Sequence, residues 1–223
     1  DTILIVDGVC ATAAEPEYLD EMGIDVLITG SQKAFGVAPG LAIVLAGPKA
    51  LERRKSLGTI RDYYVDFEKW IPVMNDPSKY FATPPVNLIW ALKESLRIIK
   101  EEGVENRYER HRKVAKAMQA ALEALGFTLL AEKEYRAVTL SNALYMDGIE
   151  DAEFRKVLAE EGVVVAGGLG AYAGKMFRLG HMGNIDYHFL ASTMAAIERT
   201  LYRLGKTDAI GKGISVLMKE LME

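Results

Sequence analysis

Residues 3–6 read ILIV and residues 25–29 read DVLIT, and these two runs decide the fold class. Each is a short, mainly apolar segment closed by a glycine within two residues, which is typical of parallel strands buried on both faces. Residues 15–22 between them have the pattern of a short helix, with Gly23 as its C-cap. Strand, helix and strand in such close succession predict an α/β fold, with residues 41–45 as a third strand.

The pattern changes along the chain, and the change predicts two domains. Residues 47–80 look irregular, and Pro84-Pro85 opens a long helix. We place the domain boundary between a large α/β domain over residues 1–105 and a small C-terminal α+β domain over residues 106–223. The predicted helices are 86–101, 106–125, 151–161 with Asp151 as N-cap, and 186–204 with Asp186 as N-cap, and the predicted strands are 127–131, 137–146, 163–166 and 177–179.

Composition and charge exclude several classes of partner. Half of the 223 residues are hydrophobic and 26% are charged, which is a globular composition, and the net charge is −4. This charge balance provides no basic surface for binding nucleic acid or an anionic membrane. The single cysteine, Cys10, predicts a reducing compartment, and no apolar run reaches the length of a membrane span. We therefore expect a cytoplasmic protein with no bound metal.

The loop at residues 31–40, SQKAFGVAPG, carries the first candidate catalytic residue. Lys33 lies just past the end of a predicted strand, where open α/β sheets build their ligand sites. Partial shielding there lowers the pKa of the amine, and the neutral amine can attack an aldehyde. Gly36 and Gly40 give the loop the tight backbone needed to close over a ligand. Taken alone, Lys33 would be interpreted as a surface lysine in an ordinary loop.

Asp7 makes the case for Lys33 stronger. It ends the preceding predicted strand, twenty-six residues before Lys33. Adjacent parallel strands bring both of these positions to the same edge of the sheet. A pyridine ring needs an acidic partner at its nitrogen to stay protonated and act as an electron sink. An Asp-Gly turn is the alternative for Asp7, but the pair and its spacing are more specific than either residue.

These segments together resemble a known family. Residues 6–10 (VDGVC), residues 31–34 (SQKA) and the following Pro39-Gly40 resemble the class V pyridoxal-phosphate aminotransferases, closest to the alanine–glyoxylate and serine–pyruvate group. The resemblance covers essentially the whole chain. It implies a type I pyridoxal-phosphate-dependent transferase fold, pyridoxal phosphate as cofactor, Lys33 as the Schiff-base lysine and Asp7 as the partner of the pyridine nitrogen.

The resemblance also assigns further residues to the cofactor. Gln32 would contact its phosphate, and Val9 would lie in the cofactor site. Residues 80–84 (YFATP) resemble the family's Tyr-x-x-Thr, in which Tyr80 and Thr83 would reach the phosphate of the neighbouring subunit in a homodimer. From the sequence alone, a helix N-cap at Thr83 is an equally good interpretation.

A second glycine-rich segment, residues 177–183 (FRLGHMG), supplies a candidate substrate-binding residue. An arginine on a short strand before such a turn can present its guanidinium fork to a carboxylate. A surface arginine is the alternative. The resemblance assigns Arg178 to the α-carboxylate of the substrate. We interpret His181 as structural, because the lysine of a transaminase already moves the proton.

The predicted activity is transfer of an amino group from alanine or serine to glyoxylate or pyruvate. Desulfurases are disfavoured because they place histidine where Gln32 stands. A phosphonate-linked transaminase, a lyase or a non-catalytic remnant of the same fold stays open. Family members carry a preceding segment with a glycine-rich phosphate loop and an aromatic residue that stacks on the ring, and neither motif lies in this chain. We therefore expect this to be the carboxy-terminal part of the enzyme, inactive by itself, with the amino-terminal segment unrecorded or present as a separate chain.

Overall fold

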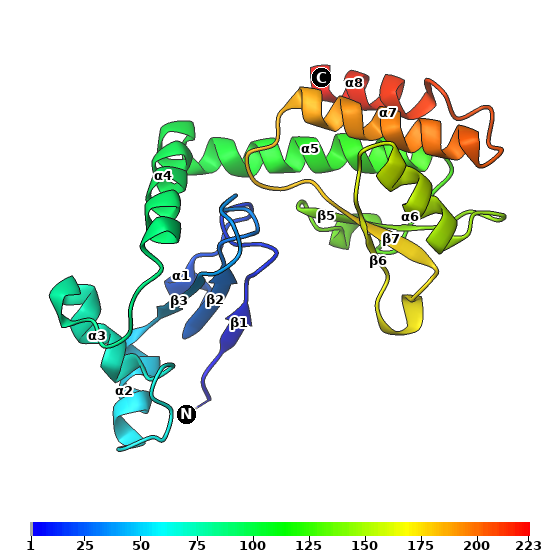
Figure 1. Ribbon diagram of the computed structural model, residues 1–223. Helices are drawn as coiled ribbons and strands as arrows, with labels where there is room; N and C mark the ends of the chain where they lie inside the picture. The colour runs from blue at the N-terminus through cyan, green and yellow to red at the C-terminus, as the bar shows by residue number, and fades with distance from the viewer. Residues whose placement is uncertain (1) are drawn as a thin grey trace. The chain divides into compact units, whose positions relative to one another are not determined.

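The computed structural model describes residues 2–223 and divides into two compact units (Figure 1). The first comprises the chain up to Thr12 together with Pro16–Glu101, and the second comprises Ala13–Glu15 together with Glu102–Glu223. No helix among the described residues combines the length and apolar character that a bilayer crossing requires.

The first unit is built on a three-stranded sheet of order β1-β2-β3. The strands are β1 (Ile5–Asp7), β2 (Val26–Gly30) and β3 (Ala42–Ala46), so each predicted strand exists within two residues of its expected bounds. β1 and β2 are parallel, as predicted, and Asp7 pairs with Ile28. β3 is antiparallel to β2, an orientation that a direct connection along residues 31–41 permits.

The helices of the first unit correct part of the prediction. The helix expected over residues 15–22 is only α1 (Leu19–Met22): Pro16 disfavours helical backbone at Glu15, and the N-cap residue Tyr18 is extended. Gly23 ends it in the left-handed conformation, with φ 65°, as predicted. α4 (Val86–Glu102) confirms the helix expected after the two prolines.

The interpretation of residues 47–80 as irregular was wrong. They contain α2 (Pro48–Ser56), α3 (Phe67–Asn75) and a short 3-10 turn, η1 (Pro77–Lys79). Pro72 lies inside α3, and a proline is unfavourable in a helix interior because it lacks a backbone donor. Asp66 caps α3 by accepting a hydrogen bond from Glu68 N at 3.0 Å, and it also pairs with Arg54 of α2. This long-range ion pair is invisible to local sequence patterns.

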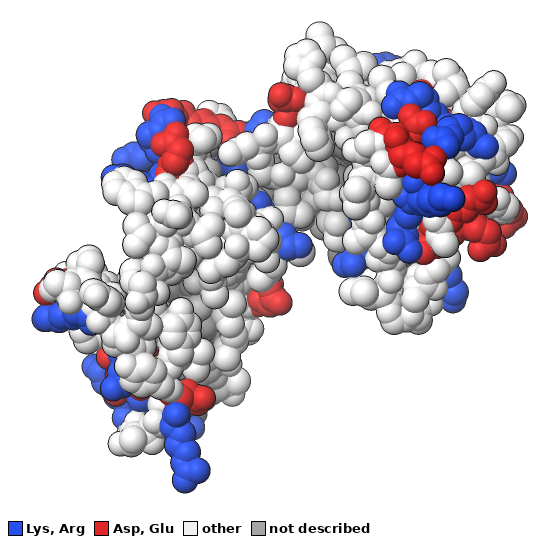
Figure 2. All heavy atoms as spheres, in the orientation of Figure 1, with Lys and Arg blue, Asp and Glu red and all other residues white. Residues whose placement is uncertain are grey.

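The first unit leaves much apolar surface exposed. Leu4 and Ile5 at β1 are 46% and 58% exposed, and Val44 and Leu45 of β3 are 43% and 42% exposed. Most of the surface of this unit that is visible in Figure 2 is uncharged. A sheet of this kind is normally covered on both faces.

The second unit is a four-stranded antiparallel sheet with helices, of strand order β4-β5-β7-β6. The helix over Lys212–Met222, α8, was not predicted, and the strand expected over residues 163–166 starts only at Ala166. Asp151 is the first residue of α6 rather than its N-cap, and its carboxylate binds Tyr145 and Arg155 instead. The elements are α5 (Val104–Ala124), β4 (Thr128–Leu129), η2 (Lys133–Tyr135), β5 (Leu140–Leu144), α6 (Asp151–Glu160), β6 (Ala166–Gly167), η3 (Gly170–Tyr172), β7 (Met176–Gly180), α7 (Tyr187–Arg203) and α8 (Lys212–Met222).

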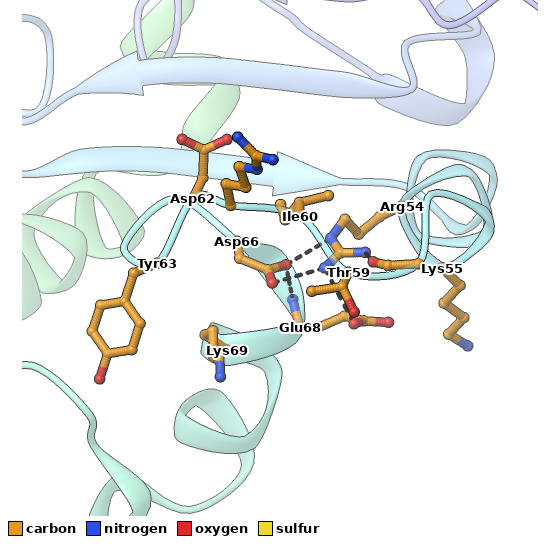
Figure 3. Close-up of a pocket in the computed structure, with 11 residues that line it drawn as sticks. Arg54, Lys55, Thr59, Ile60, Asp62, Tyr63, Asp66, Glu68 and Lys69 are labelled. Atoms are coloured by element: carbon orange, nitrogen blue, oxygen red, sulfur yellow. Dashed lines mark hydrogen bonds and ion pairs between the residues drawn. The ribbon is translucent and has the colours of Figure 1, made fainter.

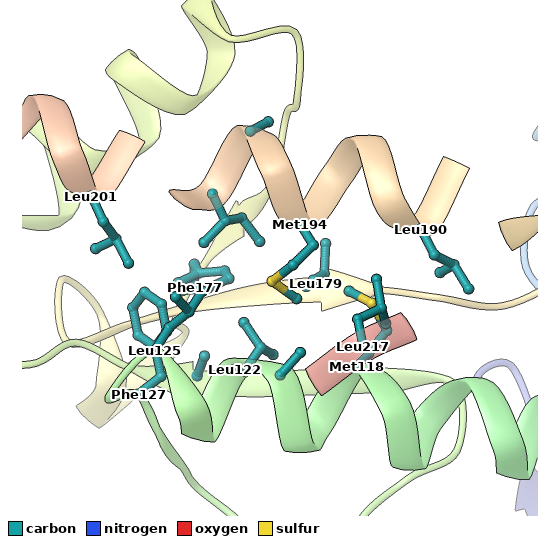
Figure 4. Close-up of a cluster of buried hydrophobic side chains, with 14 of the residues drawn as sticks. Met118, Leu122, Leu125, Phe127, Phe177, Leu179, Leu190, Met194, Leu201 and Leu217 are labelled. Atoms are coloured by element: carbon teal, nitrogen blue, oxygen red, sulfur yellow. The ribbon is translucent and has the colours of Figure 1, made fainter. Parts of the chain in front are cut away.

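The core of the second unit lies between one face of this sheet and the helices (Figure 4). Phe127, Phe154 and Phe177 form a group of rings with centroids 5.0–5.9 Å apart. Asp186 caps α7 by accepting from Phe189 N at 2.8 Å, as predicted. Alternate residues of β5 are buried, so the intervening ones, Asn142 among them, lie on the face away from this core.

Candidate active site

The loop that carries Lys33 is folded back on Ser31. The buried Ser31 hydroxyl donates to Ala38 O at 2.7 Å and accepts from Leu41 N at 3.3 Å. Gly36 N donates to Lys33 O at 2.8 Å, and Gly36 has φ 69°, where a side chain would be strained. These bonds give the half-buried Lys33 a defined backbone position directly after β2.

Helix α4 supports this loop from behind. The Ser95 hydroxyl of α4 donates to Phe35 O, and Ser95 is buried. Gly40 has φ 138°, where a side chain would be strained, and a Cβ there would also meet Leu88 Cδ1 of α4 at 2.5 Å. The lysine loop therefore rests against α4 rather than projecting freely.

Asp7 lies at the carboxyl end of β1, beside β2. Its Oδ1 accepts a hydrogen bond from Val9 N at 3.0 Å, which orients the exposed carboxylate. Gly8 N donates to Ile28 O at 2.9 Å and continues the pairing of β1 with β2. Because the two strands are parallel and adjacent, Asp7 and the segment of Lys33 leave the sheet at the same edge, as predicted.

The other predicted cofactor residues have fewer contacts that fix their position. Gln32 is exposed, and its amide lies over Gly30, where a Cβ would be 2.7 Å from Gln32 Oε1. Val9 is half-buried. Tyr80 is 57% exposed, and Thr83 is exposed in the segment before α4. Since α4 begins at Val86, Thr83 is not its N-cap, and the phosphate role of Tyr80 and Thr83 stays a prediction.

Arg178 lies on β7 in the second unit and is half-buried. Its Nε donates to Gly167 O of β6 at 2.8 Å, which leaves its two Nη groups for a carboxylate. Asn142 of β5 pairs directly with Arg178 across the sheet, and its Oδ1 is buried without a hydrogen-bond partner among residues 2–223. The sequence did not reveal that Asn142 lies next to Arg178. Alternation along β5 can be predicted from the sequence, but the register of β5 with β7 cannot.

A hollow of about 610 Å³ lies elsewhere in the first unit, between α2 and α3 (Figure 3). None of the predicted site residues lines it. Its buried guanidinium, Arg54, donates to both oxygens of Asp66, at 2.6 and 2.7 Å. The hydrogen bonds from Arg54 lower the pKa of the Asp66 carboxyl. The two charges satisfy one another, so we interpret this hollow as structural.

Comparison with known proteins decides the family. The sequence model described as "Aminotransferase class-V" matches residues 1–185. The chain belongs to the class V aminotransferases. It is 38% identical to an uncharacterized aminotransferase of Methanocaldococcus jannaschii over 99% of this chain and 58% of that protein. It is 34% identical to the serine–glyoxylate aminotransferase of Arabidopsis thaliana over 96% of this chain and 53% of that protein.

Solved structures agree with this assignment. The alanine–glyoxylate aminotransferase of Nostoc sp. superposes with a TM-score of 0.85 at 35% identity, over 90% of this chain and 54% of that one. The fold is thus that of the type I pyridoxal-phosphate-dependent transferases, as predicted. The chain spans little more than half the length of these class V aminotransferases.

The residues of this class V chain fit pyridoxal phosphate, the cofactor of the family. An amine, Lys33, and an oriented carboxylate, Asp7, leave the sheet at the same edge, and Gln32 precedes Lys33 with its amide over Gly30. These are the groups that an aldehyde, a pyridine nitrogen and a phosphate require. No cluster of three or more histidine, cysteine or acidic side chains that could hold a metal ion occurs within the described part of the chain.

Proposed function

We propose that this protein transfers an amino group from alanine or serine to glyoxylate or pyruvate, using pyridoxal phosphate. The observation that carries the proposal is the placement of Asp7 and Lys33 after two adjacent parallel strands in a class V aminotransferase chain. The choice of substrates is supported by the serine–glyoxylate and alanine–glyoxylate aminotransferases to which the chain is similar.

Each residue has a defined task in this proposal. Pyridoxal phosphate, when bound, supplies the electron sink. The Lys33 amine would hold the cofactor at its aldehyde and, once the amine of the substrate has displaced it, would carry the proton between substrate atoms. Asp7 holds the proton on the pyridine nitrogen, with its carboxylate oriented by Val9 N. Gln32 contacts the phosphate, while Tyr80 and Thr83 contact the phosphate of the partner subunit in a homodimer.

Arg178 binds the α-carboxylate of the amino acid. Its Nε is engaged by Gly167 O, so the Nη groups supply the two donors that a carboxylate accepts. Removing one charge-assisted contact of this kind costs about 2–4 kcal/mol in kcat/KM. Arg178→Ala is therefore expected to raise KM for amino acids while leaving cofactor binding intact.

In this proposal the complete enzyme contains an amino-terminal segment in addition to this chain. Residues 1–105 form the carboxy-terminal part of the large cofactor-binding domain, and residues 106–223 form the small domain. The exposed apolar faces of the first unit are covered by the amino-terminal segment, on the same polypeptide or as a separate chain. We place the homodimer in the cytosol, and we expect the 223-residue chain alone to be inactive.

Borohydride reduction of the complete enzyme, followed by peptide mapping, tests the proposal. Reduction makes the bond between cofactor and lysine permanent, so the pyridoxyl label should appear on Lys33. A label on another lysine would refute the assignment. Adding the amino-terminal segment to the isolated chain should restore turnover, whereas robust turnover by the isolated chain would contradict the proposed division of the site.

A further inference from the structure

The turn after β7, residues 181–184, is held by buried polar groups. His181 N donates to Thr139 O at 2.9 Å, which extends the pairing of β7 with β5. The His181 ring is 2% exposed, and its Nε2 lies 2.9 Å from Ser141 Oγ of β5. The contacts of His181 with β5 are the first of three sets that hold this turn, which directly follows β7, the strand of Arg178.

Helix α5 makes the second contact through His111, which is 1% exposed. His111 Nδ1 lies 2.8 Å from Arg107 O, and because a carbonyl only accepts, Nδ1 carries the proton. Nε2 is then the acceptor, and Gly183 N donates to it at 3.0 Å. Gly183 has φ 87°, so this turn needs glycine at that position. Both ring nitrogens of the neutral imidazole are therefore used.

Arg107, one helical turn earlier on α5, makes the third contact. Its side chain is fully buried, and Nη1 donates to Asn184 Oδ1 at 3.1 Å and to Glu102 Oε2 at 2.7 Å. Its Nε donates to Ala13 O at 2.9 Å. Burying a guanidinium is costly unless its donors are paired, so simple filling of the core does not explain this residue.

Directional bonds of this kind set position more sharply than apolar packing does. Apolar contacts have no preferred direction and tolerate small displacements, whereas a hydrogen bond weakens steeply when its angle changes. Arg178 lies three residues before His181 on the strand that leads into this turn. A displacement of about 1 Å in a substrate-binding group can cost roughly a hundredfold in rate.

We infer that His111 is a positioning residue for substrate binding, which fixes the turn behind β7 and thereby the place of Arg178, with the Arg107–Asn184 bond as its second anchor. This inference rests on the proposed role of Arg178 in binding the carboxylate. It gives a purpose to the two buried histidines that the amino-transfer chemistry itself does not use.

A matched pair of substitutions in the complete enzyme tests the inference. In His111→Asn the amide can still donate to Arg107 O, because its nitrogen takes the place of Nδ1, but the acceptor for Gly183 is lost. In His111→Gln the amide oxygen reaches the place of Nε2 and keeps that acceptor. We expect KM for the amino acid to rise about tenfold in His111→Asn and less than about twofold in His111→Gln, with kcat and cofactor affinity unchanged in both. Asn184→Ala, which removes the second anchor, should resemble His111→Asn.

Combining His111→Asn with Arg178→Ala separates this inference from the proposed function. If His111 acts through Arg178, the tenfold effect of His111→Asn should disappear in the Arg178→Ala background. Equal effects of the Asn and Gln variants, or an undiminished effect in that background, would overturn the inference while leaving the role of Arg178 intact. An Arg178→Ala enzyme with unchanged KM would instead overturn the proposed role of Arg178 in binding the carboxylate, and the inference with it.

Discussion

The lysine loop of the first unit (residues 31–40) and the turn that follows the strand of Arg178 in the second (residues 181–184, here called the arginine turn) are held in different ways. The lysine loop is held by backbone bonds, the Ser31 and Ser95 hydroxyls and close glycine contacts, on a sheet whose apolar residues are widely exposed. The arginine turn is held by buried side chains against a closed core in which Phe177 and Leu217 are fully buried. The second unit thus buries a complete apolar core. The first unit instead carries Lys33 and Asp7 on a sheet whose apolar side chains are partly exposed.

The largest expected effect is a loss of turnover in the first unit without a matching loss of stability. Lys33→Ala removes the amine and should lower turnover of the complete enzyme by more than about a thousandfold. Lys33 is only half-buried, so the melting temperature should change little. Steady-state kinetics and a thermal melt measure the two quantities. Lys55→Ala, an exposed lysine of α2, is the control and should leave both unchanged.

The second unit should be more sensitive than the first to loss of an apolar side chain. Phe177→Ala deletes a fully buried ring and should destabilise this unit by about 3–5 kcal/mol. Ile5→Ala in the first unit removes a side chain that is 58% exposed, and should cost less than about 1 kcal/mol in the isolated chain. Urea unfolding of the chain compares the two variants. Similar losses would mean that the units do not differ in how fully they bury their cores.

Asp7→Asn tests the carboxylate at the sheet edge. The amide cannot keep the pyridine nitrogen protonated, so single-turnover rates should fall on the order of a hundredfold. The cofactor should still bind, because Lys33 and the phosphate contacts are unchanged. Absorbance titration with pyridoxal phosphate checks binding, and stopped-flow kinetics check the rate. Unchanged rates would show that Asp7 is not the partner of the ring.

The smallest effect concerns pH and only the second unit, which contains all three histidines. Burial lowers the pKa of His111 and of His181 to about 4, from the usual 6.5. The groups around them are Arg107, Arg110 and Glu102 near His111, and His111 itself near His181. Both rings stay neutral in the folded chain, while the unfolded chain takes up protons below pH 6.5. Stability is therefore complete above pH 6.5 and is lost as pH falls toward 4.

By pH 5.5 the loss should be about 1 kcal/mol for each histidine. Urea unfolding at a series of pH values measures it, and His181→Gln should flatten the dependence. A profile that is flat for the unsubstituted chain would contradict neutral burial of the two rings.

Local patterns in the sequence were sufficient for the elements that carry the chemistry. The apolar runs closed by glycine located β1 and β2, and the residues after them located Asp7 and Lys33, because strand length and turn composition are local properties. The same reasoning recovered the cap of α7 at Asp186. It was wrong for residues 47–80, where α2 and α3 are joined by the ion pair between Arg54 and Asp66, a contact that local patterns do not reveal.

Other features were decided only by the tertiary structure. The pairing of Asn142 with Arg178 depends on strand register, and the contact between His111 and Gly183 joins residues seventy-two positions apart. The antiparallel direction of β3 likewise depends on how the lysine loop folds back on Ser31. Sequence alone determined which reactive groups this chain has and where β1 and β2 end, since both are encoded locally. How those groups are held depends on hydrogen bonds and burial between distant segments, which exist only once the chain has folded.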